Sequence, residues 1–425
     1  MKDSPSMKKK LRTLSLFSGC GGLDIGFEGN FKCLRRSINT SLHPDWIKED
    51  GKTWVKLKPT NFEITFANDI RPDARRAWTE YFKNRYNKSI YRLDSIVDLV
   101  KSEQAGEKVF PDEIDLVIGG FPCQDFSLSG KRKGFNSEKS HNGKKLEVGE
   151  PTIENRGKLY MWMRDVITLT APKLFIAENV KGLTNLTDVK EVIEHDFAKA
   201  CDGGYIVVPA RVLHVADYGV PQNRERVIFF GFKKSALTLQ ALSALQQKKI
   251  PNEFDPYPQR THFFTKDSIL SEENLLGVVT CREAFVGLTE PNDSKDPSQS
   301  KYSKAKYMGK HCQGQNEINL DSIAPTIRSE HHGNIEFRRL SYEHEGNHLD
   351  ELNLGMKERR LTVRECARIQ TFPDNYQFIL PKDEFGISVS SSDAYKIIGN
   401  AVPCVFAYNI AMRVSKNWNL YFGDQ

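Results

Sequence analysis

Short apolar runs alternate with segments of helical periodicity between residues 11 and 232, and this alternation restricts the possible folds more than any other feature. The runs that predict buried strands cover residues 11–19, 63–69, 114–120, 173–180, 205–215 and 224–232. The helical segments between them cover residues 72–86, 159–171 and 188–204. Strands that alternate with helices are typical of α/β proteins. We therefore expect a doubly wound, mostly parallel sheet.

The sequence changes character after residue 232. Residues 233–358 are polar and rich in turn-forming residues, and they carry sixteen Lys and Arg against eighteen Asp and Glu. Helical periodicity returns over residues 359–372 and near the C-terminus. The predicted domains are a larger one over residues 1–232, completed by residues 390–425, and a smaller, irregular, β-rich one over residues 233–389.

The composition predicts a soluble globular protein. Of 425 residues, 39% are hydrophobic and 27% are charged, as in packed globular proteins. No apolar run approaches the length of a membrane span, and the apolar part of the N-terminal segment is too short for a signal peptide. The eight cysteines include no Cys-x-x-Cys pair, so we expect no metal site and reduced thiols. These features predict a cytoplasmic protein without membrane contact.

The charge is unevenly distributed along the chain. The net charge of +6 is compatible with nucleic-acid binding but is common among soluble proteins. Residues 127–158 hold eight Lys and Arg against four Glu. If the chain binds a polyanion, this segment is therefore the best candidate.

A glycine-rich turn, "FSGCGGLD" (residues 17–24), follows the first predicted strand. Glycines at such a turn allow the backbone to approach a ligand at a helix N-terminus. Asp24 occupies the position of the third glycine of a nicotinamide fingerprint, so that motif is absent. The alternative is a tight turn without a ligand. Asp69 ends the second strand, where it can bind ribose hydroxyls or cap the helix that begins near Pro72.

A cysteine follows a proline at the exit of the third strand. Open α/β sheets bind ligands at the carboxyl ends of their strands, where Cys123 and Glu178 are both expected. Arg224 and Arg226 are expected on one face of another strand. The plainer interpretations are a buried structural thiol, a helix-capping carboxylate and a surface ion pair. Together these groups suit an electron-poor heterocycle: a thiolate to add, a carboxyl to hold a ring nitrogen, and cations to position an anion.

Six segments in sequence resemble the ordered motifs of the DNA (cytosine-5) methyltransferases. They are "LFSGCGGLDIGFE", "GGFPCQDFSLSGKRKGF", "ENVKGL", "DYGVPQNRERVIFFGF", "RRLTVRECARIQTFPD" and "IGNAVPCVFAYNIA". Each motif alone is weakly specific, whereas the six in this order are very specific. The resemblance extends along nearly the whole chain. It implies a compact bacterial enzyme of the restriction–modification type with the S-adenosylmethionine-dependent methyltransferase fold.

The resemblance also implies roles for individual residues. It gives Cys123 as the nucleophile, Glu178 as the contact to cytosine N3 and the exocyclic amine, and Arg224 and Arg226 as supports of the flipped nucleotide and catalytic loop. The implied S-adenosylmethionine site consists of Phe17, Ser18, Gly19, Gly21, Gly22, Leu23, Asp69, Ile70, Asp94, Ser95, Pro122, Leu159, Asn400 and Ala401. The implied or favoured DNA contacts are Gln124, Ser127, Lys131, Arg132, Thr326, Arg328, His331 and His332. Ile70 stands where many relatives carry an aromatic residue against the adenine.

The same resemblance implies a mechanism and a substrate. Cys123 adds to C6 of cytosine, so that C5 can attack the methyl group of S-adenosylmethionine, and loss of the C5 proton then expels the thiol. Because C5 is inaccessible in stacked duplex DNA, the base must be flipped out. Residues 233–358 would read the recognition sequence, and within them we favour residues 324–339, which are rich in groove-reading donors. No obligate protein partner is implied, although a cognate restriction endonuclease would be genetically linked.

Two segments are longer than in compact family members, residues 29–62 and residues 136–155. The sequence suggests no role for the first, and the second suits additional phosphate contacts. Two alternatives stay open at this point. One is a catalytically silent binding module, against which the intact cysteine, glutamate and arginines argue. The other is the transfer-RNA-acting branch of the family, against which the large region after residue 232 argues.

Overall fold

A computed structural model describes residues 10–122, 159–185, 188–264, 274–329 and 334–424. Its centre is a seven-stranded sheet in the order β6-β5-β1-β7-β8-β10-β9. The strands are β1 (Leu11–Leu16), β5 (Phe62–Asn68), β6 (Tyr91–Arg92), β7 (Leu116–Gly120), β8 (Leu174–Val180), β9 (Tyr205–His214) and β10 (Glu225–Lys233). The first five strands in this order are parallel, and β10 pairs antiparallel with both β8 and β9. The six strands that the alternation predicts are all present, and the mostly parallel sheet is confirmed.

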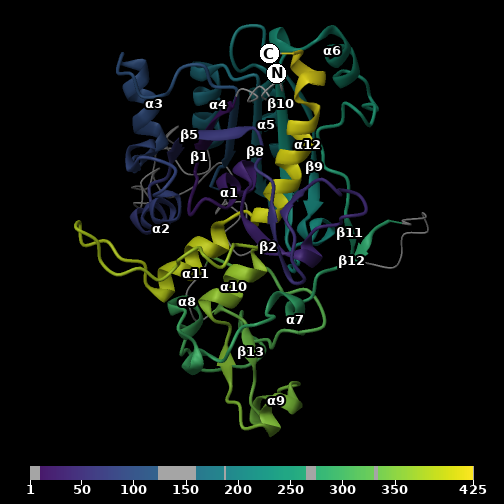
Figure 1. The fold of residues 1–425 in the computed structure, drawn as a ribbon. Coiled ribbons are helices and arrows are strands. Elements are labelled where there is room, and N and C mark those ends of the chain that lie inside the picture. The colour runs from purple at the N-terminus through teal and green to yellow at the C-terminus, as the bar shows by residue number, and fades with distance from the viewer. Residues whose placement is uncertain (1–9, 123–158, 186–187, 265–273, 330–333, 425) are drawn as a thin grey trace, which may run out of the picture.

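Helices cover both faces of this sheet (Figure 1). One face packs against α1 (Gly22–Glu28), α2 (Pro72–Phe82) and α12 (Cys404–Phe422), and the other against α3 (Ile96–Gln104), α4 (Leu159–Thr170) and α5 (Val189–Ala198). Alternate residues of one strand serve the two cores: Leu116 and Ile118 belong to the first and Val117 to the second. Strands buried on both faces read as continuous apolar runs, which explains why they were visible in the sequence.

The chain beyond β10 first returns to the sheet. Helix α6 (Leu239–Leu245) packs against α12, and Phe254 and Tyr257 join the core that contains Phe230 and Phe232. Residues 234–258 therefore lie with the larger domain, rather than in the smaller domain to which the change of composition assigned them.

The smaller part of the molecule is irregular and lies below the sheet in Figure 1. Its strands are two or three residues long: β11 (His262–Phe263), β12 (Leu276–Gly277), β13 (Phe337–Arg339) and β14 (Arg359–Arg360). Its helices are α7 (Cys281–Ala284), α8 (Pro297–Ser300), α9 (Leu349–Asn353) and α10 (Val363–Ile369). Helix α11 (Ser391–Asn400) leads back to the sheet. The part is held together by side-chain networks more than by sheet hydrogen bonds.

Residues 29–62 form a small antiparallel sheet of their own. Its strands are β2 (Lys32–Leu34), β3 (Ile47–Glu49) and β4 (Trp54–Leu57), in the order β2-β4-β3. We call residues 29–62 the insertion.

One apolar stretch meets the length and composition expected of a membrane span, residues 391–422, which join α11 to α12. Its apolar window is 78% buried inside the protein. Burial in the core accounts for its apolar character, because a core helix of this length has the same composition as a spanning helix.

Candidate active site

A glutamate lies at the strand exit that leads to Cys123. Strands β7 and β8 are parallel neighbours, and Gly120 is opposite Glu178. A Cβ atom at position 120 would lie 2.7 Å from Glu178 Oε2. A glycine is therefore needed at position 120 if the carboxyl group is to keep its place. Pro122 and Cys123 follow directly in the chain, and Cys123 itself lies outside the described residues.

Arg226 holds the same carboxyl group. Its Nε lies 2.6 Å from Glu178 Oε1, and both side chains are only 11–12% exposed. The two residues are diagonal neighbours, because Arg226 is paired with Val180 across β8 and β10. One carboxyl oxygen is thus engaged by arginine, and the other lies beside Gly120. The sequence analysis expected Glu178 at the end of its strand, as β8 (Leu174–Val180) has it, but it did not predict the contact with Arg226.

Asn179 is a site residue that the sequence analysis missed. Its buried amide donates from Nδ2 to the Phe121 carbonyl (3.1 Å), and its Oδ1 accepts from the Val180 N–H (2.8 Å). The bond to Phe121 fixes the backbone immediately before Pro122. A signal was available, because a buried Asn in an apolar strand needs hydrogen-bond partners, but its partner could not be deduced from sequence spacing.

Arg224 has a different role from Arg226. It lies just before β10, is 2% exposed, and donates to the carbonyl groups of Ile327 (3.1 Å), Gly399 (2.9 Å) and Ala401 (3.1 Å). Burial lowers the pKa of its guanidinium, and the neighbouring charge of Arg226 lowers it further. Arg224 thus joins three backbone segments, and its implied role in supporting the flipped nucleotide and the catalytic loop stays a prediction.

Two buried glutamines complete this junction and were also missed. Gln222 Nε2 donates to Gln370 Oε1 (3.0 Å), while Gln222 Oε1 accepts from the Ile327 N–H (3.1 Å). Gln370 Nε2 donates to the carbonyls of Ile398 (2.7 Å) and Ala401 (3.2 Å). The segment before β10, the residues around Ile327 and the end of α11 are therefore tied together by buried polar groups, which rigidify a site when every partner is satisfied.

The glycine turn lies at the carboxyl ends of β1 and β5. The Gly19 N–H donates to Asp69 Oδ2 (3.0 Å), and the Gly19 carbonyl accepts from the Tyr91 hydroxyl (2.9 Å). Ser18 Oγ accepts from the Asn68 N–H (3.1 Å), which joins the two strand ends. Asp69 Oδ1 accepts from the Arg71 N–H (3.0 Å), and the residue that caps α2 is Arg71. Asp69 thus holds the turn, and the helix-cap alternative is wrong.

The glycines of the turn face different neighbours. A Cβ at Gly21 would lie 2.6 Å from Trp78 Cδ1, and one at Gly22 would overlap the Val402 carbonyl. At Gly19 the corresponding Cβ position has no atom within 4 Å. The open side of the turn is therefore at Gly19, whereas Gly21 and Gly22 allow close packing against α2 and the residues after α11.

Asp24 explains why the third glycine of the fingerprint is absent. Its fully buried carboxyl accepts from Ser15 Oγ and from Trp78 Nε1, each at 2.6 Å. Burial raises the pKa of Asp24 to about 7, although both hydrogen bonds act to lower it. The side chain fastens the turn to α2 from within the core, so it has a structural role.

The other predicted cofactor residues differ in exposure, and their role in binding a cofactor stays a prediction. Ile70 is 46% exposed, Asp94 is half-exposed beside Arg92 (3.2 Å), and Asn400 is the exposed last residue of α11. Ser95 caps α3 and Leu159 is the buried first residue of α4, so these two support the site from behind. Carboxylates, an apolar side chain and an open glycine backbone suit a ligand with hydroxyl groups, an ammonium group and an aromatic base.

Comparison with known proteins agrees with this geometry. The family model described as C-5 cytosine-specific DNA methylase matches residues 11–416. The chain belongs to this family. It is 30% identical to the type II methyltransferase M.FnuDI of Fusobacterium nucleatum, over 96% of this chain and 94% of that protein. It is 28% identical to M.NgoPII of Neisseria gonorrhoeae, over 97% and 98% of the two chains. The solved structure of S. pombe Dnmt2 methyltransferase has the same fold, with a TM-score of 0.54, 17% identity, and coverage of 96% of this chain and 99% of that one.

The DNA-facing predictions for this methyltransferase have mixed outcomes. Gln124, Ser127, Lys131, Arg132, His331 and His332 lie outside the described residues. The Thr326 hydroxyl donates to the Asn223 carbonyl. Arg328 Nη2 forms an ion pair with Glu336 Oε1 (2.9 Å), and the arginine side chain is 25% exposed. Base contact by Arg328 therefore requires it to share or to release Glu336.

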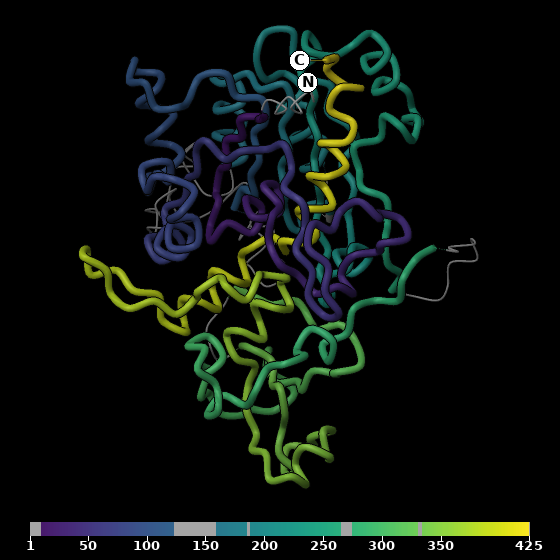
Figure 2. The backbone as a smooth tube through the Cα atoms, viewed as in Figure 1, coloured from purple at the N-terminus to yellow at the C-terminus, as the bar shows by residue number. Residues whose placement is uncertain are grey.

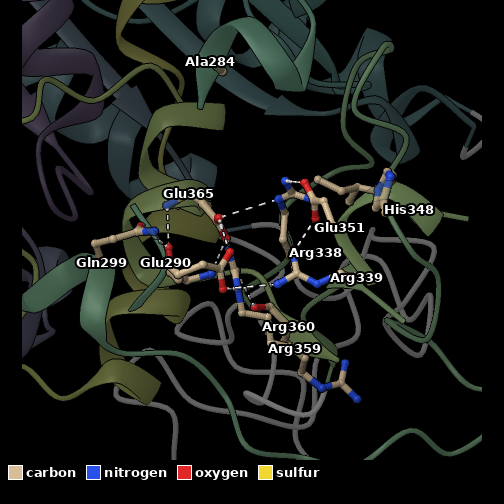
Figure 3. A network of polar contacts seen from close by, with 12 residues as sticks. Ala284, Glu290, Gln299, Arg338, Arg339, His348, Glu351, Arg359, Arg360 and Glu365 are labelled. Atoms are coloured by element: carbon tan, nitrogen blue, oxygen red, sulfur yellow. Dashed lines mark hydrogen bonds and ion pairs between the residues drawn. The ribbon is translucent and has the colours of Figure 1, made fainter. Parts of the chain in front are cut away.

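Two arginines of the favoured 324–339 stretch are not available to DNA bases. Figure 3 shows Arg338 and Arg339 inside a network of arginine and glutamate side chains. The network consists of Arg338, Arg339, Arg359, Glu290, Glu351 and Glu365. Arg339 is fully buried, and Arg338 Nη2 lies 2.6 Å from Glu351 Oε1. These two residues are internal supports of the smaller part, so the prediction that the whole stretch supplies groove-reading donors needs correction.

The described residues contain no group of three or more His, Cys, Asp or Glu side chains arranged to hold a metal ion.

Proposed function

We propose that this DNA (cytosine-5) methyltransferase uses S-adenosylmethionine to methylate C5 of cytosine at a specific duplex sequence, and that Cys123 is its nucleophile. The observation that carries the proposal is the packing of the Glu178 carboxyl against Gly120, at the strand exit that leads to Cys123. A carboxyl group there can bind N3 and the exocyclic amine of a cytosine whose C6 faces the thiol. This arrangement suits an electron-poor heterocycle and no acyl-transfer substrate.

The catalytic steps follow from these residues. The Cys123 thiolate forms a bond to C6, and the electron pair of the C5–C6 double bond becomes available at C5. Glu178 stabilises the adduct at N3, while Arg226 fixes the carboxyl and Asn179 fixes the backbone before Pro122. Once C5 has used this electron pair to bond to a methyl group, loss of the C5 proton to a base restores the C5–C6 double bond and expels the thiolate.

The cofactor site is proposed at the open side of the glycine turn. When bound there, S-adenosylmethionine supplies an electrophilic methyl group. Phe17, Ser18, Gly19 and Leu23 would form the turn around the amino-acid moiety, Asp69 would bind the ribose hydroxyls, and Asp94 and Ile70 would contact the adenine. Pro122, Asn400 and Ala401 would close the side nearest the catalytic centre.

Duplex DNA is proposed to bind between the larger part and residues 274–389. The basic residues Lys131 and Arg132 would contact phosphates, and the residues around Thr326 and Arg328 would contact bases. Because the curated relatives are named type II methyltransferases, we propose that the modification protects cytoplasmic host DNA from a cognate restriction endonuclease.

A direct assay tests this function. Purified enzyme with radiolabelled S-adenosylmethionine should label duplex DNA, and bisulfite sequencing should place 5-methylcytosine within one short recurrent sequence. Cys123→Ala should abolish labelling. Labelling of transfer RNA in preference to duplex DNA, or unselective methylation of cytosines, would contradict the proposal.

A further inference from the structure

The insertion (residues 29–62) crosses from the larger part of the molecule to the smaller one. Figure 2 shows this dark-purple segment passing in front of α12 toward the green residues that follow β12. Near α12, the Trp46 and Tyr408 rings meet edge to face at 5.3 Å, and the Tyr408 hydroxyl donates to the Lys58 carbonyl (3.1 Å). One end of the insertion is therefore anchored on the main core.

The other end of the insertion holds the connection between the two parts. The side chain of Asn39 is 1% exposed, and its Nδ2 donates to the carbonyls of Thr261 (3.0 Å) and Asn274 (2.6 Å). His262 Nε2 donates to the Arg36 carbonyl (2.9 Å), and burial lowers the pKa of this histidine to about 4, so the ring is neutral. Residues 261–262 and Asn274 are thus both bound to the insertion.

Arg36 extends this attachment to α7. Its Nε lies 2.9 Å from Glu283 Oε1, and its Nη2 donates to the Gly277 carbonyl (3.2 Å). Helix α7 is in turn bound to residues 320–322: the Cys281 N–H donates to the Ser322 carbonyl (2.9 Å) and the Arg282 N–H to the Leu320 carbonyl (2.8 Å). We call residues 320–328 the recognition segment, since they lead to Thr326 and Arg328.

A second contact holds the far end of α7. The Arg368 guanidinium lies 4.6 Å from the centre of the Trp54 ring and donates to the carbonyls of Ala284 (3.1 Å) and Val286 (2.7 Å). A small pocket of about 20 Å³ lies where the insertion, Pro221 and α7 meet, lined by residues that include Cys33, Pro221 and Ala284.

We propose that Arg36 and Asn39 are positioning residues that hold α7, and through it the recognition segment, at the distance from Glu178 that bound DNA requires. Gln222 and Arg224 of the larger part bind the backbone of Ile327 in this segment. The insertion reaches the beginning of the segment through α7. The inference rests on the proposed role of the recognition segment in contacting DNA. It predicts that removing the contacts between the insertion and α7 raises the KM for DNA and leaves the affinity for S-adenosylmethionine unchanged.

Adjacent arginines provide a matched pair of variants. Arg36 contacts Glu283 outside the insertion, whereas Arg35 contacts Asp50 and the Gly51 carbonyl within it. Arg36→Ala should raise the KM for the cognate duplex about fivefold, as expected from losing one half-exposed ion pair and a hydrogen bond. Arg35→Ala should leave this KM unchanged. In both variants the Kd for S-adenosylmethionine, measured by calorimetry, should match the wild type.

Glu283→Gln tests the same contact from the other side. It should raise the KM for DNA, by less than Arg36→Ala because the hydrogen bond from Arg36 to Gly277 remains, and it should add little when combined with Arg36→Ala, which already removes the ion pair. An unchanged KM in Arg36→Ala, or an equal rise in Arg35→Ala, would overturn the proposal while DNA methylation by the wild type stands. Absence of DNA methylation by the wild type would instead contradict the proposed function.

Asn39→Ser gives a test that does not depend on turnover. In the full-length enzyme, amide hydrogen exchange should become faster in residues 276–284 and stay unchanged in β1 and β5. Unchanged exchange in residues 276–284 would show that Asn39 does not hold the connection, and would equally overturn the proposal.

Discussion

Gly120 and Glu178 lie opposite each other on β7 and β8, and the glycine leaves the space that the glutamate carboxyl occupies. The carboxyl group then lies between this backbone and the guanidinium of Arg226. Cys123, the predicted nucleophile, follows three residues after Gly120 in the chain and lies outside the described residues.

Gly120→Ala should therefore impair turnover. The new Cβ displaces the Glu178 carboxyl, and small displacements of catalytic groups have large kinetic effects, so kcat should fall by about tenfold or more. Binding of S-adenosylmethionine and the melting temperature should change little. Gly277→Ala is the control, since a Cβ there meets no atom within 4 Å. Equal kcat values for the two variants would show that Glu178 does not depend on Gly120.

The glycine turn predicts different effects for its members. Gly19→Ala places a methyl group on the open side of the turn and should weaken S-adenosylmethionine binding about tenfold, or about 1.4 kcal/mol. Because Gly19 has φ +53°, the alanine should also lower the stability of the fold by roughly 1 kcal/mol, less than the clash at Gly21 does. Gly21→Val should instead destabilise the fold, because its side chain meets Trp78 and its φ is +83°. Calorimetry and thermal unfolding separate the two outcomes. If Gly21→Val folded normally and lost only cofactor binding, the open side would be at Gly21.

Asp24 predicts a pH dependence of stability. Its folded-state pKa of about 7 lies above the ordinary value of 3.8, so the folded state binds the proton more tightly than the unfolded state. The stabilising contribution of the protonated form is complete below about pH 4 and is lost as pH rises toward 7, by on the order of a few kcal/mol. Asp24→Asn should remove this loss, so its melting temperature relative to wild type should increase between pH 5 and pH 8. If the melting temperatures of the two proteins changed with pH in parallel, the raised pKa of Asp24 would be contradicted.

Arg328 can be tested for base contact separately from its ion pair. Arg328→Ala leaves the buried carboxyl of Glu336 without its cation, and the melting temperature should fall. Combining it with Glu336→Gln should restore the melting temperature. If Arg328 also contacts a base, the double variant should still discriminate less between cognate and altered sites, by roughly 1–3 kcal/mol. Full discrimination by the double variant would limit Arg328 to a structural role.

The sequence predicted the sheet because its strands are buried on both faces. Leu116, Val117 and Ile118 alternate between two cores, so all three are apolar. Helix α11 was missed although the sequence carries two signals for it: the Ser390 and Asp393 capping box at its beginning and an apolar face of Ala394, Tyr395, Ile397 and Ile398.

The position of Glu178 near the end of its strand was predictable, because β8 ends two residues later at Val180. Cys123 lies outside the described residues and stays a prediction. Contacts between residues distant in sequence could not be predicted. Gln222 and Gln370 were missed because their hydrogen bond joins residues 148 positions apart, and the spacing of residues in the sequence does not indicate such a pair. The backbone partners of Arg224 could not be predicted for the same reason, since they lie 103 to 177 residues away.

Covalent trapping of DNA tests the central claim most directly. If Cys123 adds to C6, a target site carrying 5-fluorocytosine should accept the methyl group but be unable to lose fluorine as a cation. The enzyme should then remain bound to that DNA in denaturant, only when S-adenosylmethionine is present, with the adduct on Cys123. Cys123→Ser should give no complex, because a serine hydroxyl is a much weaker nucleophile. Cys20→Ala, which changes a buried thiol of the glycine turn, should still trap the DNA if it folds. An adduct on any residue other than Cys123, or no adduct with active enzyme, would contradict the account.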